Sequence, residues 1–155
     1  MVDTAAATAT APGAAPLRPG ERIAAALRAA AKAGQPALVA YLTAGFPERK
    51  RFRAHLQAIA SAADVVEIGV PFSDPMADGV TIQRASEQAL RAGVSLRWIL
   101  AELQSLPALA TPLLLMSYLN PLLAYGLPRL AQDAARAGIC GFIVPDLPFD
   151  ESDEL

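Results

Sequence analysis

The feature that most constrains the fold of this chain is a repeated alternation of apolar, strand-length runs with amphipathic segments. The apolar runs span residues 36–42, 64–70, 111–118 and 139–148, the last including its loop. Strands that are apolar on both faces need cover on both faces, which is the situation of parallel sheets built from βαβ units. The pattern therefore predicts an α/β fold with a parallel sheet.

Helical spacing of apolar residues predicts the elements that lie between these runs. The expected helices span residues 21–32, 51–63, 81–93, 96–106 and 127–138. A turn is expected at Asn120-Pro121, and the last residues, 150–155, resemble the start of another helix. Residues 1–19 are rich in Ala, Thr and Pro and offer little to bury, so they are predicted to be a disordered tail. Residues 20–155 are predicted to form one domain.

Two architectures fit this order of elements: an open doubly wound sheet, or the first half of a (β/α)₈ barrel, which typically needs about 250 residues. Polar residues follow each predicted strand, namely Thr43, Asp78, Tyr118 with Asn120, and Asp146. In a barrel these four loops share one end, where active sites form. The sequence therefore favours a partial (β/α)₈ TIM barrel, strands 1 to 4.

Composition excludes several classes of function. The formal net charge is −2, so we expect no nucleic-acid partner. No apolar run approaches the roughly 18–20 residues that a membrane helix needs, and we expect no membrane association. Cys140 is the only cysteine, which precludes an internal disulfide and favours a cytoplasmic location. Glycine-rich phosphate loops and metal-ligand clusters are absent from the sequence, so no metal site is predicted.

The segment VVEIGVPFSDPMADGVTIQ, residues 65–83, contains the strongest candidates for chemistry. Glu67 lies in a predicted buried strand, where a charge costs free energy unless it is paired or neutralised. One interpretation is a general acid–base whose pKa is raised by an apolar interior. The alternative is a strand-end carboxylate that neighbouring backbone N–H groups hold in place.

Asp78 follows Glu67 by eleven residues, and together they suggest two carboxylates at opposite ends of one small substrate. Taken alone, Asp78 could instead cap the helix that begins near Thr81. Asp74 has the alternative of an Asx-turn within Ser73-Asp74-Pro75.

Four other side chains have plain structural interpretations beside the functional ones. Tyr41 and Tyr118 could stack on an aromatic substrate, although strand-end tyrosines are often part of the core. His55 is expected on the surface of its helix. Cys140 is expected to be an inert thiol in the core.

LTAGFP, VEIGVPFSDPMADGVTIQ, MSYLNP and FIVPDLP, in this order and spacing, closely resemble the tryptophan synthase alpha chain family. The resemblance implies a (β/α)₈ barrel preceded by a helix, residues 21–32, that covers the barrel bottom. It also implies retro-aldol cleavage of indole-3-glycerol phosphate to indole and glyceraldehyde 3-phosphate. A whole barrel has about 250 residues, so the phosphate site on its later loops is expected to lie outside this sequence.

The resemblance assigns roles to particular residues. Glu67 would donate a proton to indole C3, and Asp78 would accept the indole N–H. Residues expected at the substrate are Tyr41, Ile82, Tyr118 and Val144, with Thr43 and Asp146 close by. Residues expected to face a partner are Pro71, Asp74 and Asn120, the last within residues 120–125. Val80 stands where the family often has proline, and we expect little effect on the rigidity of the loop.

The partner implied by the resemblance is a tryptophan synthase beta chain, in an assembly of two alpha and two beta chains. No cofactor is expected in this chain, because pyridoxal phosphate would be carried by the beta chain. Two alternatives remain: a catalytically impaired half barrel that acts only as a binding module for the beta chain, and a pair of copies that completes an eight-stranded barrel.

Overall fold

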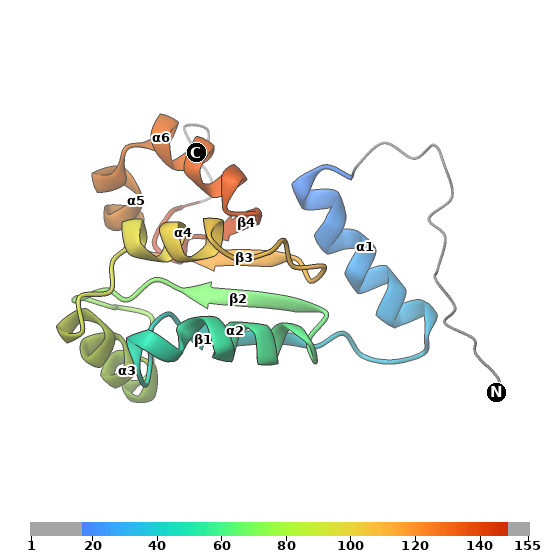
Figure 1. Ribbon diagram of the computed structural model, residues 1–155, viewed down its shortest axis with the longest axis horizontal. Coiled ribbons are helices and arrows are strands. Elements are labelled where there is room, and N and C mark those ends of the chain that lie inside the picture. The colour runs from blue at the N-terminus through green and yellow to red at the C-terminus, as the bar shows by residue number, and fades with distance from the viewer. Residues whose placement is uncertain (1–16, 149–155) are drawn as a thin grey trace, which may run out of the picture.

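In the computed structural model, which describes residues 17–148, four parallel strands form one sheet in sequence order (Figure 1). The strands are β1 (Val39–Thr43), β2 (Val65–Gly69), β3 (Leu113–Met116) and β4 (Ile139–Ile143). Each pairs with the next strand in the sequence, whereas a doubly wound sheet reverses its strand order at a switch point. The architecture is thus the first four strands of a barrel, as the sequence predicts. The proposed tail falls largely on residues 1–16 and the last helix start on 150–155, outside the described residues.

The five helices predicted within residues 17–148 are present, with small shifts at their ends. They are α1 (Pro19–Lys32), α2 (Phe52–Ala60) after a short 3₁₀ turn η1 (Arg49–Arg51), α3 (Val80–Arg91), α4 (Leu96–Gln104) and α6 (Leu127–Arg136). Helix α1 begins two residues earlier than expected, because proline suits the first helical position and Glu21 accepts a hydrogen bond from the Arg18 N–H at 2.8 Å. Residue 19, predicted as part of the tail, therefore belongs to the helix.

The expected turn at Asn120-Pro121 is wrong, because these residues lie inside a helix, α5 (Leu119–Tyr125). Pro121 is the third residue of that helix, where a backbone N–H has no partner within the helix, so proline removes no hydrogen bond there. Leu122 is fully buried and anchors the helix to the core.

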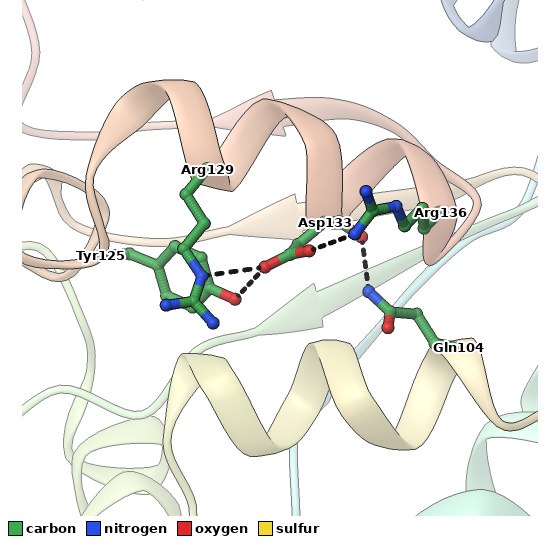
Figure 2. A network of polar contacts seen from close by, with 5 residues as sticks. All are labelled: Gln104, Tyr125, Arg129, Asp133 and Arg136. Atoms are coloured by element: carbon green, nitrogen blue, oxygen red, sulfur yellow. Dashed lines mark hydrogen bonds and ion pairs between the residues drawn. The ribbon is translucent and has the colours of Figure 1, made fainter.

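Helix α5 is also tied to its neighbours by a network of polar contacts around Asp133 of α6 (Figure 2). The Tyr125 hydroxyl donates to Asp133 Oδ2 at 2.6 Å, and Arg129 and Arg136 pair with the same carboxylate. Gln104 of α4 donates to the Asp133 backbone carbonyl at 2.9 Å. The network therefore joins α4, α5 and α6.

The core fills the space between one face of the sheet and the helices. That face presents Leu42, Val66, Ile68, Leu113 and Leu115, all of which are buried. Apolar side chains of the helices pack against it, among them Phe52 and Leu56 of α2, Ile99 and Leu100 of α4, and Leu130 of α6. Helices α2 and α4 lie in front of the strands in Figure 1. This side of the sheet is thus the packed side.

The opposite face of the sheet is more open. Side chains alternate between faces along a strand, so this face carries Tyr41, Glu67, Leu114 and Met116, all only partly buried. Helix α1 lies beside the amino-terminal ends of the strands (Figure 1), where the Arg22 guanidinium donates to the carbonyls of Leu109 and Ala110. The carboxyl ends of the strands and the open face remain available for a site.

Candidate active site

Glu67 occupies the centre of β2 and faces the open side of the sheet. It pairs in register with Tyr41 of β1 and with Leu114 of β3, so these three side chains share one row of one face. Burial raises the pKa of the Glu67 carboxyl above its ordinary value of 4.5. Within residues 17–148 the Glu67 carboxylate accepts no hydrogen bond. The alternative interpretation, a strand-end carboxylate that neighbouring backbone N–H groups hold in place, is therefore wrong.

Tyr41 reaches from β1 across the end of β2. A Cβ atom placed on Gly69 would lie 2.1 Å from the Tyr41 hydroxyl oxygen, so only glycine leaves room for this ring. The hydroxyl lies 3.3 Å from the Thr43 Oγ1 atom. Burial raises the pKa of the Tyr41 phenol, and the nearby charges of Asp78 and Glu67 raise it further. The structure therefore places Tyr41 beside Glu67, and the charge of Asp78 also acts on its phenol.

Asp78 lies at the end of the loop between β2 and α3, residues 70–79, and is half-buried. The residue that caps α3 is Gly79, and the Asp78 side chain makes no capping hydrogen bond. Its backbone carbonyl accepts from Gln83 Nε2 at 2.9 Å, which ties the end of the loop to the helix. The capping interpretation of the Asp78 carboxylate is therefore wrong.

Tyr118, at the end of β3, is only 5% exposed. Its hydroxyl accepts a hydrogen bond from the Ala77 N–H at 2.8 Å, and its ring stacks on Phe72 with centroids 5.1 Å apart. Both partners belong to the loop that carries Asp78. The sequence predicted a stacking surface for substrate here, but it gave no sign that Tyr118 would hold this loop.

Two of the remaining substrate candidates fall in different pockets. Ile82 lines a pocket with Tyr41, Thr43 and His55, at the open edge of β1. His55 is therefore partly enclosed and not simply a surface residue.

Val144 lines a separate pocket of about 310 Å³ with Phe142, Leu147 and residues of α6. The structure does not bring Val144 to the pocket of Tyr41. Cys140 is buried in β4, as expected, with Arg22 Nη1 3.5 Å from its sulfur.

The residues predicted to face a partner differ in exposure. Asp74 and Asn120 are exposed at the carboxyl end of the strands, and Asp74 accepts a hydrogen bond from the Ser73 hydroxyl. Pro71 is buried, so it shapes the loop and presents no surface of its own. Met76, between Asp74 and Asp78, is 94% exposed and was not singled out from the sequence.

Asp146, in the loop after β4, has a contact that the sequence did not predict. Its Oδ1 atom accepts a hydrogen bond from the Leu119 N–H at 2.9 Å, at the first residue of α5. A carboxylate at a helix N-terminus is a common arrangement, but Asp146 is distant in sequence from α5. Only the acidity of its side chain could have suggested this contact.

This arrangement can transfer a proton and stabilise a positive charge on one small ligand. Because its pKa is raised, the Glu67 carboxyl keeps its proton to a higher pH than an exposed glutamate and is suited to act as an acid. A second carboxylate, Asp78, stands at the end of the neighbouring loop. Within the described residues no three acidic, histidine or cysteine side chains gather as a metal site would require.

Comparison with known proteins gives one consistent family. The family model of the tryptophan synthase alpha chain matches residues 27–155. The tryptophan synthase alpha chain of Desulfovibrio desulfuricans is 56% identical over 131 residues, which are 83% of this chain and 51% of the relative. That of Chloroflexus aurantiacus is 50% identical over 126 residues, 79% of this chain and 47% of the relative.

Solved structures agree with the sequence relatives. Tryptophan synthase subunit alpha from Legionella pneumophila str. Paris superposes with a TM-score of 0.79 at 40% identity, covering 86% of this chain and 52% of that chain. A chain of tryptophan synthase from M. tuberculosis gives a TM-score of 0.79 at 39% identity, covering 86% and 54%. The chain thus spans about half the length of the relatives it matches. None of the described helices has the length and apolar character needed to cross a membrane.

Proposed function

The chain belongs to the tryptophan synthase alpha chain family, and from this premise we propose that it takes part in the cleavage of indole-3-glycerol phosphate to indole and glyceraldehyde 3-phosphate. The observation that carries the proposal is Glu67, a carboxyl of raised pKa that lies beside Tyr41 in one row of the open face, with Asp78 at the end of the loop that follows its strand. The activity is that of a carbon–carbon lyase in tryptophan biosynthesis.

Each carboxylate has a separate part in this reaction. The Glu67 carboxyl donates its proton to C3 of the indole ring, which makes the ring nitrogen iminium-like and turns the ring into an electron sink. The Asp78 carboxylate accepts the indole N–H and stabilises the positive charge that develops there. The hydroxyl on the adjoining glycerol carbon then gives its proton to the Glu67 carboxylate, the bond between C3 and that carbon breaks with its electron pair returning to the ring, and the carbon becomes the aldehyde.

The other predicted residues bind the substrate or the partner. Tyr41 and Ile82 flank one pocket and supply apolar surface for the indole ring. The partner we propose is a tryptophan synthase beta chain, in an assembly of two alpha and two beta chains in the cytoplasm. The exposed side chains of Asp74 and Asn120 would face it. Pyridoxal phosphate would be bound by that partner, and this chain would use no cofactor of its own.

The test is indole production from indole-3-glycerol phosphate by the purified chain, alone and with a beta chain. We expect Glu67→Gln to lower the rate by about 10²–10⁴-fold, the usual contribution of a general acid, and Asp78→Asn to lower it by about 10²–10³-fold, the usual loss when one group that stabilises developing charge is removed. Glu87→Gln is the matched control, because Glu87 is exposed on α3 and its one ion pair within residues 17–148 is with Arg91. Equal rates in Glu67→Gln and Glu87→Gln would contradict the proposed role of Glu67.

A second function, a non-catalytic module that binds the beta chain, is favoured by the apolar side chains exposed beside the predicted partner residues. Met76 is 94% exposed and Leu123 of α5 is 51% exposed. Calorimetric titration with the beta chain separates the two functions. Binding that survives in Glu67→Gln, together with a wild-type chain that releases no indole, supports the module; absence of heat excludes it.

A further inference from the structure

The three loops that follow β2, β3 and β4 are joined by two hydrogen bonds that meet at consecutive residues. Ala77, in the first loop, donates its N–H to the Tyr118 hydroxyl. Leu119, the next residue after Tyr118, donates its N–H to Asp146 in the third loop. We call these four residues, Ala77, Tyr118, Leu119 and Asp146, the loop strap.

The first bond holds the residue next to Asp78. The Tyr118 ring is buried, so its hydroxyl cannot swing away without losing the stacking on Phe72. Phe72 lies near the start of the loop and Ala77 near its end, so one side chain fixes the loop at two points. The loop would otherwise be free to move between these points, since Met76 and Ala77 themselves are exposed.

The second bond fixes the backbone from which Tyr118 projects. The Leu119 N–H is one of the groups that a helix leaves without an internal partner, and the Asp146 carboxylate supplies one at 2.9 Å. A hydrogen bond to an ionised acceptor is stronger than one between neutral groups, and the helix N-terminus favours the negative charge. Asp146 thereby holds the junction between β3 and α5.

We propose that Tyr118 and Asp146 are positioning residues, which hold Asp78 in place through the loop strap. Tyr118 acts directly on the loop, and Asp146 acts through the backbone of residues 118–119. The inference rests on the proposed function only for the role of Asp78 in the reaction. The loop strap itself depends only on the contacts between the three loops.

Amide hydrogen exchange of the 155-residue chain, followed residue by residue by NMR, tests the strap without any need for activity. Tyr118→Phe keeps the stacked ring and removes only the hydroxyl. We expect the Ala77 amide to exchange about 5–10-fold faster, as the loss of one hydrogen bond gives. Asp146→Ala should speed exchange at Leu119 and, by a smaller factor, at Ala77.

The matched control is Asp64→Ala. Asp64 Oδ2 accepts the Leu38 N–H at 2.8 Å, the same kind of bond at the opposite end of the sheet. We expect it to speed exchange at Leu38 and to leave Ala77 unchanged. An Ala77 rate that does not change in Tyr118→Phe would overturn the strap. A rate that changes in Tyr118→Phe but not in Asp146→Ala would overturn the role of Asp146.

The kinetic arm uses the same variants with indole-3-glycerol phosphate and the beta chain. Misplacing Asp78 should lower kcat about tenfold in Tyr118→Phe while KM changes less than twofold, because Asp78 acts on charge that develops in the transition state. A KM that rises while kcat stays unchanged would indicate lost substrate binding and overturn the positioning role. A wild-type chain that releases no indole would count against the proposed function, and the exchange experiment would still decide the strap.

Discussion

At the scale of single residues, Glu67 links the chemistry of the site to the stability of the fold. Burial raises the pKa of its carboxyl, so the folded state prefers the protonated form more than the unfolded state does. The stabilising contribution is therefore complete below the unfolded pKa of about 4.5, and it is lost as the pH rises through the higher folded pKa.

This direction of the pH dependence of stability gives a prediction for Glu67→Gln, whose amide side chain carries no charge at any pH. We expect the variant to be more stable than the wild type at pH 8 and the difference to shrink as the pH falls toward 4.5. Urea denaturation midpoints measured across this range provide the test, with the exposed Glu87→Gln as the control. A difference that is the same at every pH would contradict the burial of this charge.

Gly69 gives a second prediction at this scale. The Tyr41 hydroxyl lies where a Cβ on Gly69 would be, so Gly69→Ala must displace the tyrosine. We expect a loss of about 1–3 kcal/mol in the free energy of unfolding, the usual cost of overpacking. Gly20→Ala is the control, because nothing lies within 4 Å of its Cβ position and it lies in helix α1, where alanine is favoured.

A double-mutant cycle with Tyr41→Leu identifies the cause of this loss. The cost of Gly69→Ala should fall sharply once the tyrosine ring is gone. A cost that stays the same in the Tyr41→Leu background would mean that the ring is not what excludes a side chain at Gly69.

The candidate residues could be recognised in the sequence because a carboxylate within an apolar strand is unusual. Their surroundings could not be recognised in the same way. The contact of Tyr118 with Ala77 spans 41 positions, and nothing in the sequence marks Ala77 as a donor. Likewise, Val144 lines a pocket beside α6 because of how β4 ends, which the spacing of residues does not specify. Its role at the substrate, and those of the other site residues, stay predictions.

At the scale of elements, α5 depends on the network around Asp133 (Figure 2). The hydrogen bond from Tyr125 lowers the pKa of the Asp133 carboxyl, and the guanidinium groups of Arg129 and Arg136 lower it further. The folded pKa lies below the unfolded one, so this contribution to stability is present above the unfolded pKa and is lost as the pH falls through the folded pKa.

We therefore expect Tyr125→Phe to reduce stability more at pH 7 than at acid pH, because the lost partner is the ionised carboxylate. The Phe ring keeps the contacts with the Arg97 and Arg129 guanidinium groups, whose carbon atoms lie 5.7 and 5.5 Å from the ring centre. Urea midpoints at several pH values measure the effect, beside Arg91→Gln as a control on α3. A loss that does not depend on pH would mean that the network contributes through packing alone.

The order and type of most elements followed from the sequence because apolar periodicity is strong in them. Helix α5 did not follow, because proline and asparagine normally mark turns and the helix has only seven residues. Its stability comes from partners that are distant in sequence, the Asp146 carboxylate at one end and Asp133 at the other. These contacts cannot be predicted from the pattern of residues within the helix itself.

At the scale of the whole molecule, both edges of the sheet expose apolar residues. Val39 of β1 is 46% exposed and Phe142 of β4 is 41% exposed, and the outer backbone groups of these edge strands have no partner strand within the described residues. The unpaired backbone groups of exposed edge strands can pair with a strand of another molecule. A preparation of these 155 residues should therefore self-associate, and a pair of copies would bring eight strands together.

Size-exclusion chromatography with light scattering tests this expectation. We expect a mass of at least twice 16.2 kDa, and a shift toward the monomer in Val39→Lys and Phe142→Glu, which place charges on the two edges. Leu123→Glu, at an exposed position on α5 and so outside both edge strands, is the control. A single species of 16.2 kDa at all concentrations would contradict the expectation.

The strictly sequential order of the sheet has a consequence for how the chain is made. Every strand pairs with the strand that precedes it in synthesis, so no segment must wait for a distant one before it can add to the sheet. Such pairing keeps each chain segment that must close as short as the βαβ connection allows, and the entropic cost of closing a loop rises with its length. As the ribosome delivers the chain from its amino terminus, β1 and β2 can pair while β3 and β4 have yet to emerge. The nascent sheet can thus grow one strand at a time, and Glu67 can pair with Tyr41 before Leu114 of β3 has been translated.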